Sequence, residues 1–284
     1  MAEIQNIQWF PGHMAKTRRL IKECLPLIDA VAEIVDSRVP SGSRNPDLSE
    51  LIAGKPRIIL LNKCDMADPA VTDMWIKHYK DEGVTAIPVD CRTGKGLNVF
   101  KTTVKDILSD KLAQYREKGM VGKPLRVMVV GIPNVGKSSF INRMVGASRA
   151  KVENRPGVTR GNQWFKIDNE LELLDTPGVL WPKLDDALAG EYLAFTGAVK
   201  DDVLDIEWLA VRLLEVLSDK YMDLLTKTYG IEKDEPYEML CAFAKKRGML
   251  IRGGEYDTER AANILMAEFR TQKIGRITLE VPNA

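Results

Sequence analysis

The chain has 284 residues, 45% of them hydrophobic, and a formal net charge of +1. Such a chain can bury one sizeable α/β core and a smaller second one. No apolar stretch approaches the roughly 18 residues of a membrane span, and the N-terminus has neither a signal-peptide core nor a transit pattern. We therefore expect a cytoplasmic protein that does not contact membranes, with four reduced cysteines that form neither a disulfide nor a zinc site.

Apolar runs alternate with helix-like stretches through the first two thirds of the chain. Six runs predict strands, at 30–35, 57–61, 85–89, 125–130, 164–167 and 171–174. Helical periodicity lies between them, at 70–81 and 98–118. This alternation predicts an α/β fold with a mainly parallel sheet, helices on both of its faces and ligands at the carboxyl ends of its strands.

Strand signals fade after residue 182, and the rest of the chain shows helical periodicity. The expected helices are 184–195, 205–219, 221–229, 236–247 and 257–272. Gly230, Gly248 and Gly275 follow three of them as expected C-caps. We therefore predict a nucleotide-binding domain over residues 1–182 and a small all-helical domain over residues 183–284.

The first chemical motif is Asn62-Lys63-Cys64-Asp65, at the end of the predicted strand 57–61. The Asp65 carboxylate can accept from N1–H and the exocyclic amine of guanine together, a pair of donors that adenine lacks. The aliphatic stem of Lys63 can cover the base, and we expect Asn62 to tie this loop to the phosphate loop. The motif therefore predicts guanine specificity.

Asp90-Cys91-Arg92 follows the next predicted strand. GTPases often carry Ser-Ala-Lys here, with a backbone N–H that meets guanine O6. We assign Asp90 and Cys91 to the base pocket on this position in the chain, although their side chains depart from the common pattern.

The motif GIPNVGKS at 131–138 is a phosphate loop, because it follows a predicted strand and opens a predicted helix. Its glycines let successive backbone N–H groups point at phosphates, and the helix N-terminus adds positive charge. Lys137 should reach the β- and γ-phosphate oxygens, and the Ser138 hydroxyl should ligate Mg²⁺. The other residues assigned to nucleotide binding in this loop are Asn134, Val135, Gly136 and Ser139.

Two further segments complete a nucleotide switch. DTPG at 175–178 follows the last predicted strand, so Asp175 would hold the Mg²⁺ site, through water, and the Gly178 N–H would meet the γ-phosphate. Within RPGVT at 155–159, Thr159 can complete the Mg²⁺ shell and touch the γ-phosphate, with a plain surface loop as the alternative. We assign Lys137, Thr159 and Gly178 to catalysis.

The guanine motif precedes the phosphate loop, which reverses the usual order of a G domain while retaining all of its parts. Circular permutation produces such an order. The series NKCD, DCR, GIPNVGKS, RPGVT and DTPG resembles the circularly permuted GTPases of the YlqF/YawG family. WFPGHM at 9–14, DSRVP at 36–40, RNP at 44–46 and LWPK at 180–183 look most like its bacterial ribosome-biogenesis members.

The resemblance implies GTP hydrolysis coupled to late assembly of the large (50S) ribosomal subunit. It also implies binding to ribosomal RNA in the GTP state, and a C-terminal domain that resembles RNA-binding ANTAR modules. We expect a monomer.

The position after Gly178 is Val179, where Ras-like proteins carry a water-orienting Gln, so intrinsic turnover should be slow. His13 is a candidate for positioning water, because the family match places its segment near the site; a structural histidine is the alternative. Asn134 matches GTPases in which an Asn helps to hold K⁺ beside the phosphates. The alternative for Asn134 is an ordinary loop-stabilising residue.

Two classes of function remain open on the sequence. One is a GTPase that assembles ribosomes, and the other is a regulatory or tRNA-modifying GTPase with separate chemistry in its C-terminal domain. Residues 183–284 contain no His and only one Cys, which disfavours the second class. Basic residues there suit RNA phosphates instead: Lys245, Lys246, Arg247, Arg252, Arg270, Lys273 and Arg276. Four more could serve a polyanion or form a solvated loop: Arg149, Lys151, Arg155 and Arg160.

Overall fold

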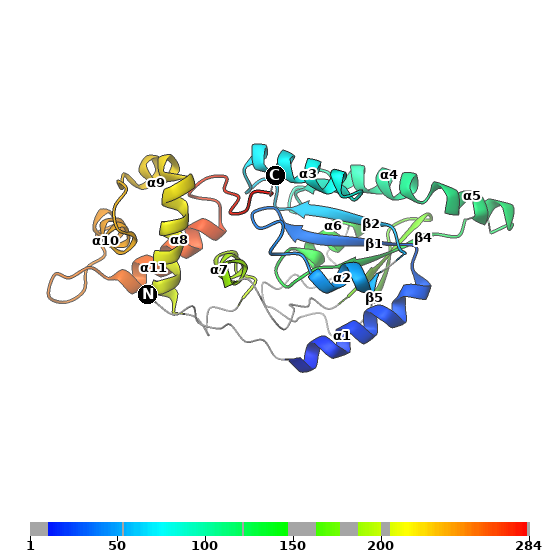
Figure 1. Ribbon diagram of the computed structural model, residues 1–284, viewed down its shortest axis with the longest axis horizontal. Helices are drawn as coiled ribbons and strands as arrows, with labels where there is room; N and C mark the ends of the chain where they lie inside the picture. The colour runs from blue at the N-terminus through cyan, green and yellow to red at the C-terminus, as the bar shows by residue number, and fades with distance from the viewer. Residues whose placement is uncertain are drawn as a thin grey trace.

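A twisted sheet forms the centre of the N-terminal part of the molecule (Figure 1). The computed structural model describes residues 11–52, 54–120, 122–146, 163–176, 187–199 and 205–282. Within them the sheet has the order β3-β2-β1-β4-β6-β5, and only β5 runs antiparallel to its neighbour. The strands are β1 (Ala30–Asp36), β2 (Arg57–Asn62), β3 (Thr85–Val89), β4 (Leu125–Val130), β5 (Gln163–Lys166) and β6 (Leu171–Asp175). The sequence predicted all six to within one residue at each end.

Helices cover both faces of this sheet, as predicted. Because side chains alternate along a strand, Val31 and Val35 of β1 point to one face and Ala32 and Ile34 to the other. The first face packs against α1 (Pro11–Cys24), α2 (Pro46–Leu51) and α3 (Pro69–Asp81). The second packs against α4 (Leu97–Ile107) and α6 (Lys137–Val145). The strands β1, β2, β4 and β6 are therefore largely buried on both sides and apolar along most of their length.

The predicted helix 98–118 is two helices, α4 and α5 (Ser109–Glu117), which meet at Leu108. Leu108 is buried and leaves helical geometry with φ −104° and ψ 19°. The side chains of α4 continue the core, whereas those of α5 are half-buried or exposed. Packing against the sheet thus ends at Leu108, and periodicity alone did not reveal this break. The helices α1, η1 (Leu25–Leu27) and α2 were also not predicted from the sequence.

The C-terminal part is helical, as predicted. Its helices are α7 (Ala187–Phe195), α8 (Ile206–Lys220), α9 (Met222–Tyr229), α10 (Pro236–Lys246) and α11 (Thr258–Arg270). Figure 1 shows α8 to α11 grouped at one end of the molecule, with α7 between them and the sheet. None of the helices in the described ranges is long and apolar enough to cross a membrane.

Two of the three expected glycine caps are present. Gly230 ends α9 with φ 67°, and Gly248 follows α10 with φ 65°. The prediction for Gly275 was wrong, because α11 ends at Arg270 and Thr271 is its C-cap. Gln272 then takes the left-handed conformation, with φ 68°. A residue other than glycine in this conformation is uncommon and points to a local constraint.

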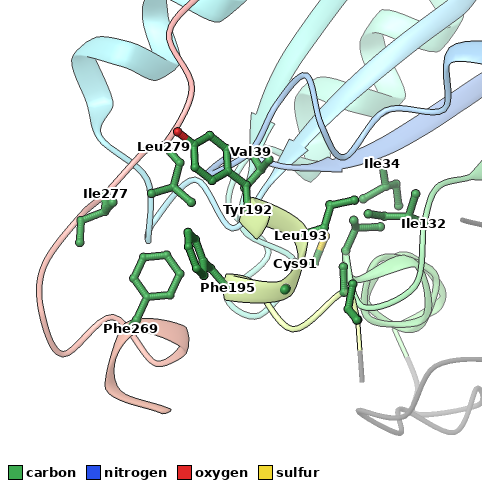
Figure 2. Close-up of a cluster of buried hydrophobic side chains, with 14 of the residues drawn as sticks. Ile34, Val39, Cys91, Ile132, Tyr192, Leu193, Phe195, Phe269, Ile277 and Leu279 are labelled. Carbon is green, nitrogen blue, oxygen red and sulfur yellow. The ribbon is translucent and has the colours of Figure 1, made fainter. Parts of the chain in front are cut away.

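The chain after α11 returns to the nucleotide-binding part and ends beside α3 (Figure 1). We call residues 272–282 the C-terminal strap. Figure 2 shows side chains of α7 packed between this strap and the loops at the end of the sheet. Phe195 faces Phe269 and the strap, whereas Leu193 faces Ile132 of the phosphate loop. One continuous apolar cluster therefore joins the sheet to the helical part; the division at residues 182 and 183 stays a prediction.

Candidate nucleotide-binding site

The guanine motif, the phosphate loop and Asp175 meet at one edge of the sheet. Parallel strands place their carboxyl ends on the same side, and the phosphate loop (131–138) follows β4. Asp175 ends β6, and the guanine loop, which we define as residues 62–68, begins at the end of β2. Since β1 lies between β2 and β4, the two loops are one strand apart. A nucleotide that contacts both loops would therefore lie across the carboxyl end of β1.

The phosphate loop is built around glycines that no larger residue could replace. A Cβ atom on Gly131 would lie 2.5 Å from the Ile34 carbonyl oxygen. A Cβ atom on Gly136 would lie 2.3 Å from Nδ2 of Asn62, and Gly136 has φ 102°. Both glycines therefore allow the close backbone approach that a phosphate loop requires.

Lys137 is a buried ammonium group at the start of α6. Its Nζ atom donates to the carbonyl oxygens of Gly131 at 2.9 Å and Ile132 at 3.0 Å. Burial lowers the pKa of Lys137 to about 8, and the nearby charge of Asp175 offsets only part of that effect. A buried cation held by neutral oxygens gains most from an anionic ligand, and a phosphate is such a ligand.

Ser138 and Asp175 fit the Mg²⁺ role assigned to them. Ser138 lies in the first turn of α6 directly after Lys137, and Asp175 is buried at the end of β6. A hydroxyl and a carboxylate beside a phosphate cradle are oxygen donors of the kind that Mg²⁺ takes in such sites. Thr159, Gly178 and Val179 lie outside the described residues.

Asn62 joins the two loops. Its Nδ2 atom donates to the Val135 carbonyl at 2.6 Å, and its Oδ1 atom accepts from the Cys91 backbone N–H at 3.1 Å. The first bond is the link to the phosphate loop expected from the sequence. The second bond holds the Cys91 backbone, while burial raises the pKa of the Cys91 thiol to about 12 and keeps it protonated.

Asp65 lies where its carboxylate is partly open to solvent, with 25% of the side chain exposed. Arg92 approaches it, with 3.4 Å between Nη2 and Oδ2. Asp90 has a local role: its carboxylate accepts from the Arg92 N–H at 2.8 Å and the Thr93 hydroxyl at 2.6 Å, which shapes the turn after β3. The sequence analysis did not predict the contact between Arg92 and Asp65, although Arg92 belongs to the Asp90-Cys91-Arg92 motif.

Lys63 forms an ion pair with a buried carboxylate. Its Nζ atom lies 2.9 Å from Oδ2 of Asp36, and Arg38 donates twice to the same carboxylate, at 2.9 and 2.7 Å. Burial raises the pKa of Asp36, but the charges of Arg38 and Lys63 outweigh this effect and hold it well below its usual range. Asp36 and Arg38 belong to the DSRVP stretch, which contributed to the family resemblance but had no role assigned to it from the sequence.

Asn134 contacts the helical part of the molecule. Its Nδ2 atom donates to the Gly197 carbonyl, just after α7, at 2.6 Å. Asn134 also has a left-handed backbone, with φ 61°. His13 lies in the first turn of α1, and its side chain is outside the described part of the structure. The structure therefore connects the phosphate loop to α7, and the role of His13 stays a prediction.

Comparison with known proteins gives consistent matches. A family model described as "50S ribosome-binding GTPase" matches residues 126–241. The chain is 47% identical to ribosome biogenesis GTPase A of Priestia megaterium, over 98% of both chains. It is 34% identical to the protein of that name from Thermotoga maritima, over 97% of this chain and 95% of that one.

Solved structures agree with these relatives. The GDP-bound structure of YlqF has a TM-score of 0.65 at 29% identity and covers 92% of this chain and 98% of that one. The GNP-bound YlqF from T. maritima has a TM-score of 0.64 at 29% identity, and covers 94% and 99% of the two chains. The chain therefore matches relatives and solved structures of nearly the same length.

Proposed function

Because the chain belongs to the ribosome biogenesis GTPase A family and is a GTP hydrolase of ribosome biogenesis, we propose that it drives late assembly of the large (50S) subunit, which it binds in the GTP state. We further propose that it acts in the cytoplasm as a monomer. The observation that carries the proposal is the bond from Asn134 of the phosphate loop to Gly197 beside α7. Through that contact, a change at the phosphates can reach the helical part directly.

The chain's own residues supply most of the hydrolytic site. Lys137 would hold the β- and γ-phosphate oxygens, and Thr159 and Gly178 would sense the γ-phosphate. Ser138, Thr159 and Asp175 would hold Mg²⁺, which supplies positive charge against the phosphates. Since Val179 has no group that can orient water, intrinsic turnover is slow in this proposal, and the ribosomal subunit stimulates it.

Two further groups are proposed to assist hydrolysis. His13 positions the attacking water. Asn134 helps to hold K⁺ beside the phosphates; because its Nδ2 atom is the donor to Gly197, Oδ1 is the atom that can coordinate the cation. An additional positive charge there would stabilise the transition state.

The proposed RNA contact lies on the end of the helical part farthest from the sheet. Lys245 and Lys246 are exposed in the last turn of α10, and Arg252 is exposed in the loop that follows. Leu250 and Ile251 of that loop are also exposed, at 56% and 47%. The three cations of this surface suit contact with RNA phosphates.

Other basic residues considered for RNA have partners inside the molecule. Arg270 donates to the carbonyl oxygens of Ala194 at 2.8 Å and Phe195 at 2.9 Å. Arg247 and Lys273 both pair with Glu268. Arg276 donates to the guanine loop. We therefore assign the RNA contact chiefly to Lys245, Lys246 and Arg252.

Co-sedimentation with purified large subunits tests this function. We expect binding with a non-hydrolysable GTP analogue, much less with GDP, and a steep loss of binding on addition of salt. The triple change Lys245→Ala, Lys246→Ala and Arg252→Ala should weaken binding without changing nucleotide affinity. A charge-matched control alters three exposed residues of α3 and α5: Lys77, Lys80 and Arg116.

Equal co-sedimentation with analogue, with GDP and without nucleotide, together with a GTPase rate that subunits do not change, would contradict the proposal. Such a result would favour the alternative, a regulatory or tRNA-modifying GTPase that does not act on the ribosome.

A further inference from the structure

The C-terminal strap binds the guanine loop along its backbone. The carbonyl oxygens of residues 64–67 each accept a hydrogen bond from the strap. Arg276 spans the stretch, because Nη2 donates to the first carbonyl at 2.8 Å and Nε to the fourth at 2.9 Å. The Gln272 side chain donates to the second carbonyl at 2.6 Å, and the Ile277 backbone N–H to the third at 3.0 Å. The strap thus fixes four consecutive peptide groups around Asp65.

We propose that the C-terminal strap determines how tightly this protein selects guanine, with Gln272 and Arg276 acting as positioning residues for Asp65. The proposal rests on Asp65 being the guanine-reading residue of the proposed GTPase site. The second carbonyl, to which Gln272 donates, is that of Asp65 itself. The Gln272 and Arg276 side chains donate their hydrogen bonds to the loop backbone, so they act through Asp65 and need no contact with the nucleotide.

The physical reason lies in how Asp65 reads a base. Its two carboxylate oxygens must meet two donors at once, so the direction of its Cα–Cβ bond has to be correct to within a small angle. The contact with Arg92 does not fix that direction, because the Arg92 side chain is itself 76% exposed. The direction is instead set by the peptide groups on either side of Asp65, and these are the groups that the strap binds.

The backbone of Gln272 supports a functional role for its side chain. With φ 68° it occupies a conformation that glycine adopts without strain and that longer side chains rarely adopt. Such a position after a helix is commonly glycine. Folding alone would therefore be served better by glycine here, whereas only a longer side chain can reach the Asp65 carbonyl.

The strap is itself firmly held, so it can impose a position on the loop. The Leu279 N–H donates to the Arg38 carbonyl at 2.8 Å, and the Arg38 side chain pairs with Asp36, the carboxylate that also binds Lys63. Farther along, Trp75 of α3 donates to the Glu280 carbonyl at 3.0 Å. Ile277 and Leu279 are buried among the side chains drawn in Figure 2. The helical part and the base pocket are therefore connected by a route that does not involve the γ-phosphate.

The test compares GDP with inosine diphosphate, which keeps N1–H but lacks the exocyclic amine. We would measure the Kd of both nucleotides for the full chain and for the variants Gln272→Gly and Arg276→Ala. We expect GDP affinity to fall about tenfold in each variant and inosine diphosphate affinity to fall less. The preference for GDP should therefore decrease at least about threefold, because the second donor is the contact most sensitive to the angle of the carboxylate.

Two comparisons separate positioning from a general loss of structure. Gln272→Gly should leave the Tm unchanged or higher, since it removes the strained φ, while guanine preference falls. Arg276→Lys should restore part of the preference, because one ammonium can reach one carbonyl but not both. Arg260→Ala, an exposed residue of α11, is the matched control and should change neither affinity.

Preference for GDP within twofold of the unmodified chain in both variants would overturn the proposal. A parallel loss of both affinities together with a lower Tm would also overturn it, because the strap would then be only structural. These measurements use no ribosomal subunits, so their outcome is independent of whether the proposed role in subunit assembly is correct.

Discussion

Replacing Asn62 tests whether the base-reading and phosphate-binding halves of the site are a single mechanical unit. Asn62 is 3% exposed, and both of its hydrogen bonds reach buried residues, Val135 and Cys91. In Asn62→Ala both bonds disappear and leave a buried carbonyl and a buried N–H. Each lost bond costs about 1–2 kcal/mol when its partner stays unsatisfied, so we expect a loss of about 2–4 kcal/mol in the free energy of unfolding.

Asn62→Asp is the sharper variant because it preserves shape. Its carboxylate can still accept from the Cys91 N–H, but an oxygen would face the Val135 carbonyl at the position of a 2.6 Å hydrogen bond. The resulting repulsion should make this change at least as destabilising as Asn62→Ala, and GDP affinity should fall about tenfold or more in both variants. The exposed Asn263→Ala serves as a control.

Urea unfolding followed by intrinsic fluorescence gives the stability, and titration with GDP gives the affinity. If the free energy of unfolding of Asn62→Asp lies within about 0.5 kcal/mol of that of the unmodified chain, the hydrogen bond to Val135 contributes little to stability. If GDP affinity is also unchanged, the idea that Asn62 couples the two loops is wrong.

Four further predictions concern the chemistry. Asp65→Asn should weaken GTP binding and favour a xanthine nucleotide; similar ATP and GTP affinities for the unmodified chain in a titration would remove Asp65 as the guanine reader. Hydrolysis should be faster in K⁺ than in Na⁺ at equal ionic strength, by about a hundredfold if Asn134 helps to hold K⁺, whereas equal rates would leave Asn134 a purely structural role. His13→Ala should slow hydrolysis and spare GTP affinity, the pattern of a contact made only in the transition state; an equal loss of affinity or of thermal stability would indicate a structural histidine. Burial lowers the pKa of Lys137 to about 8, so the protonated form opposes folding below that pH and the opposition is relieved as pH rises toward the unfolded value of about 10.4. Because a bound phosphate favours the charged form, GDP affinity should fall between pH 7.5 and pH 9.5, and a constant Kd over that range would contradict the buried-ammonium assignment.

The sequence by itself determined the sheet, the position of the chemical motifs and the family. Buried parallel strands have nearly continuous apolar runs, such as residues 127–130 of β4. A phosphate loop is recognisable because its glycines are required within eight consecutive residues. The helices α8 to α11 could also be predicted, since each buries one face at helical spacing. These are local requirements, and a local requirement leaves a local pattern.

Only the tertiary structure decided what the helical part does to the nucleotide site. Nothing in the sequence around Gln272, Arg276 or Gly197 shows that they meet the guanine loop and Asn134. The sequence analysis assigned Arg276 to RNA binding. A sequence cannot distinguish an arginine that donates to carbonyl oxygens inside the molecule from one that faces solvent. Single polar contacts between residues far apart in the chain have no period and no fixed spacing, so they become visible only when folding brings the partners together.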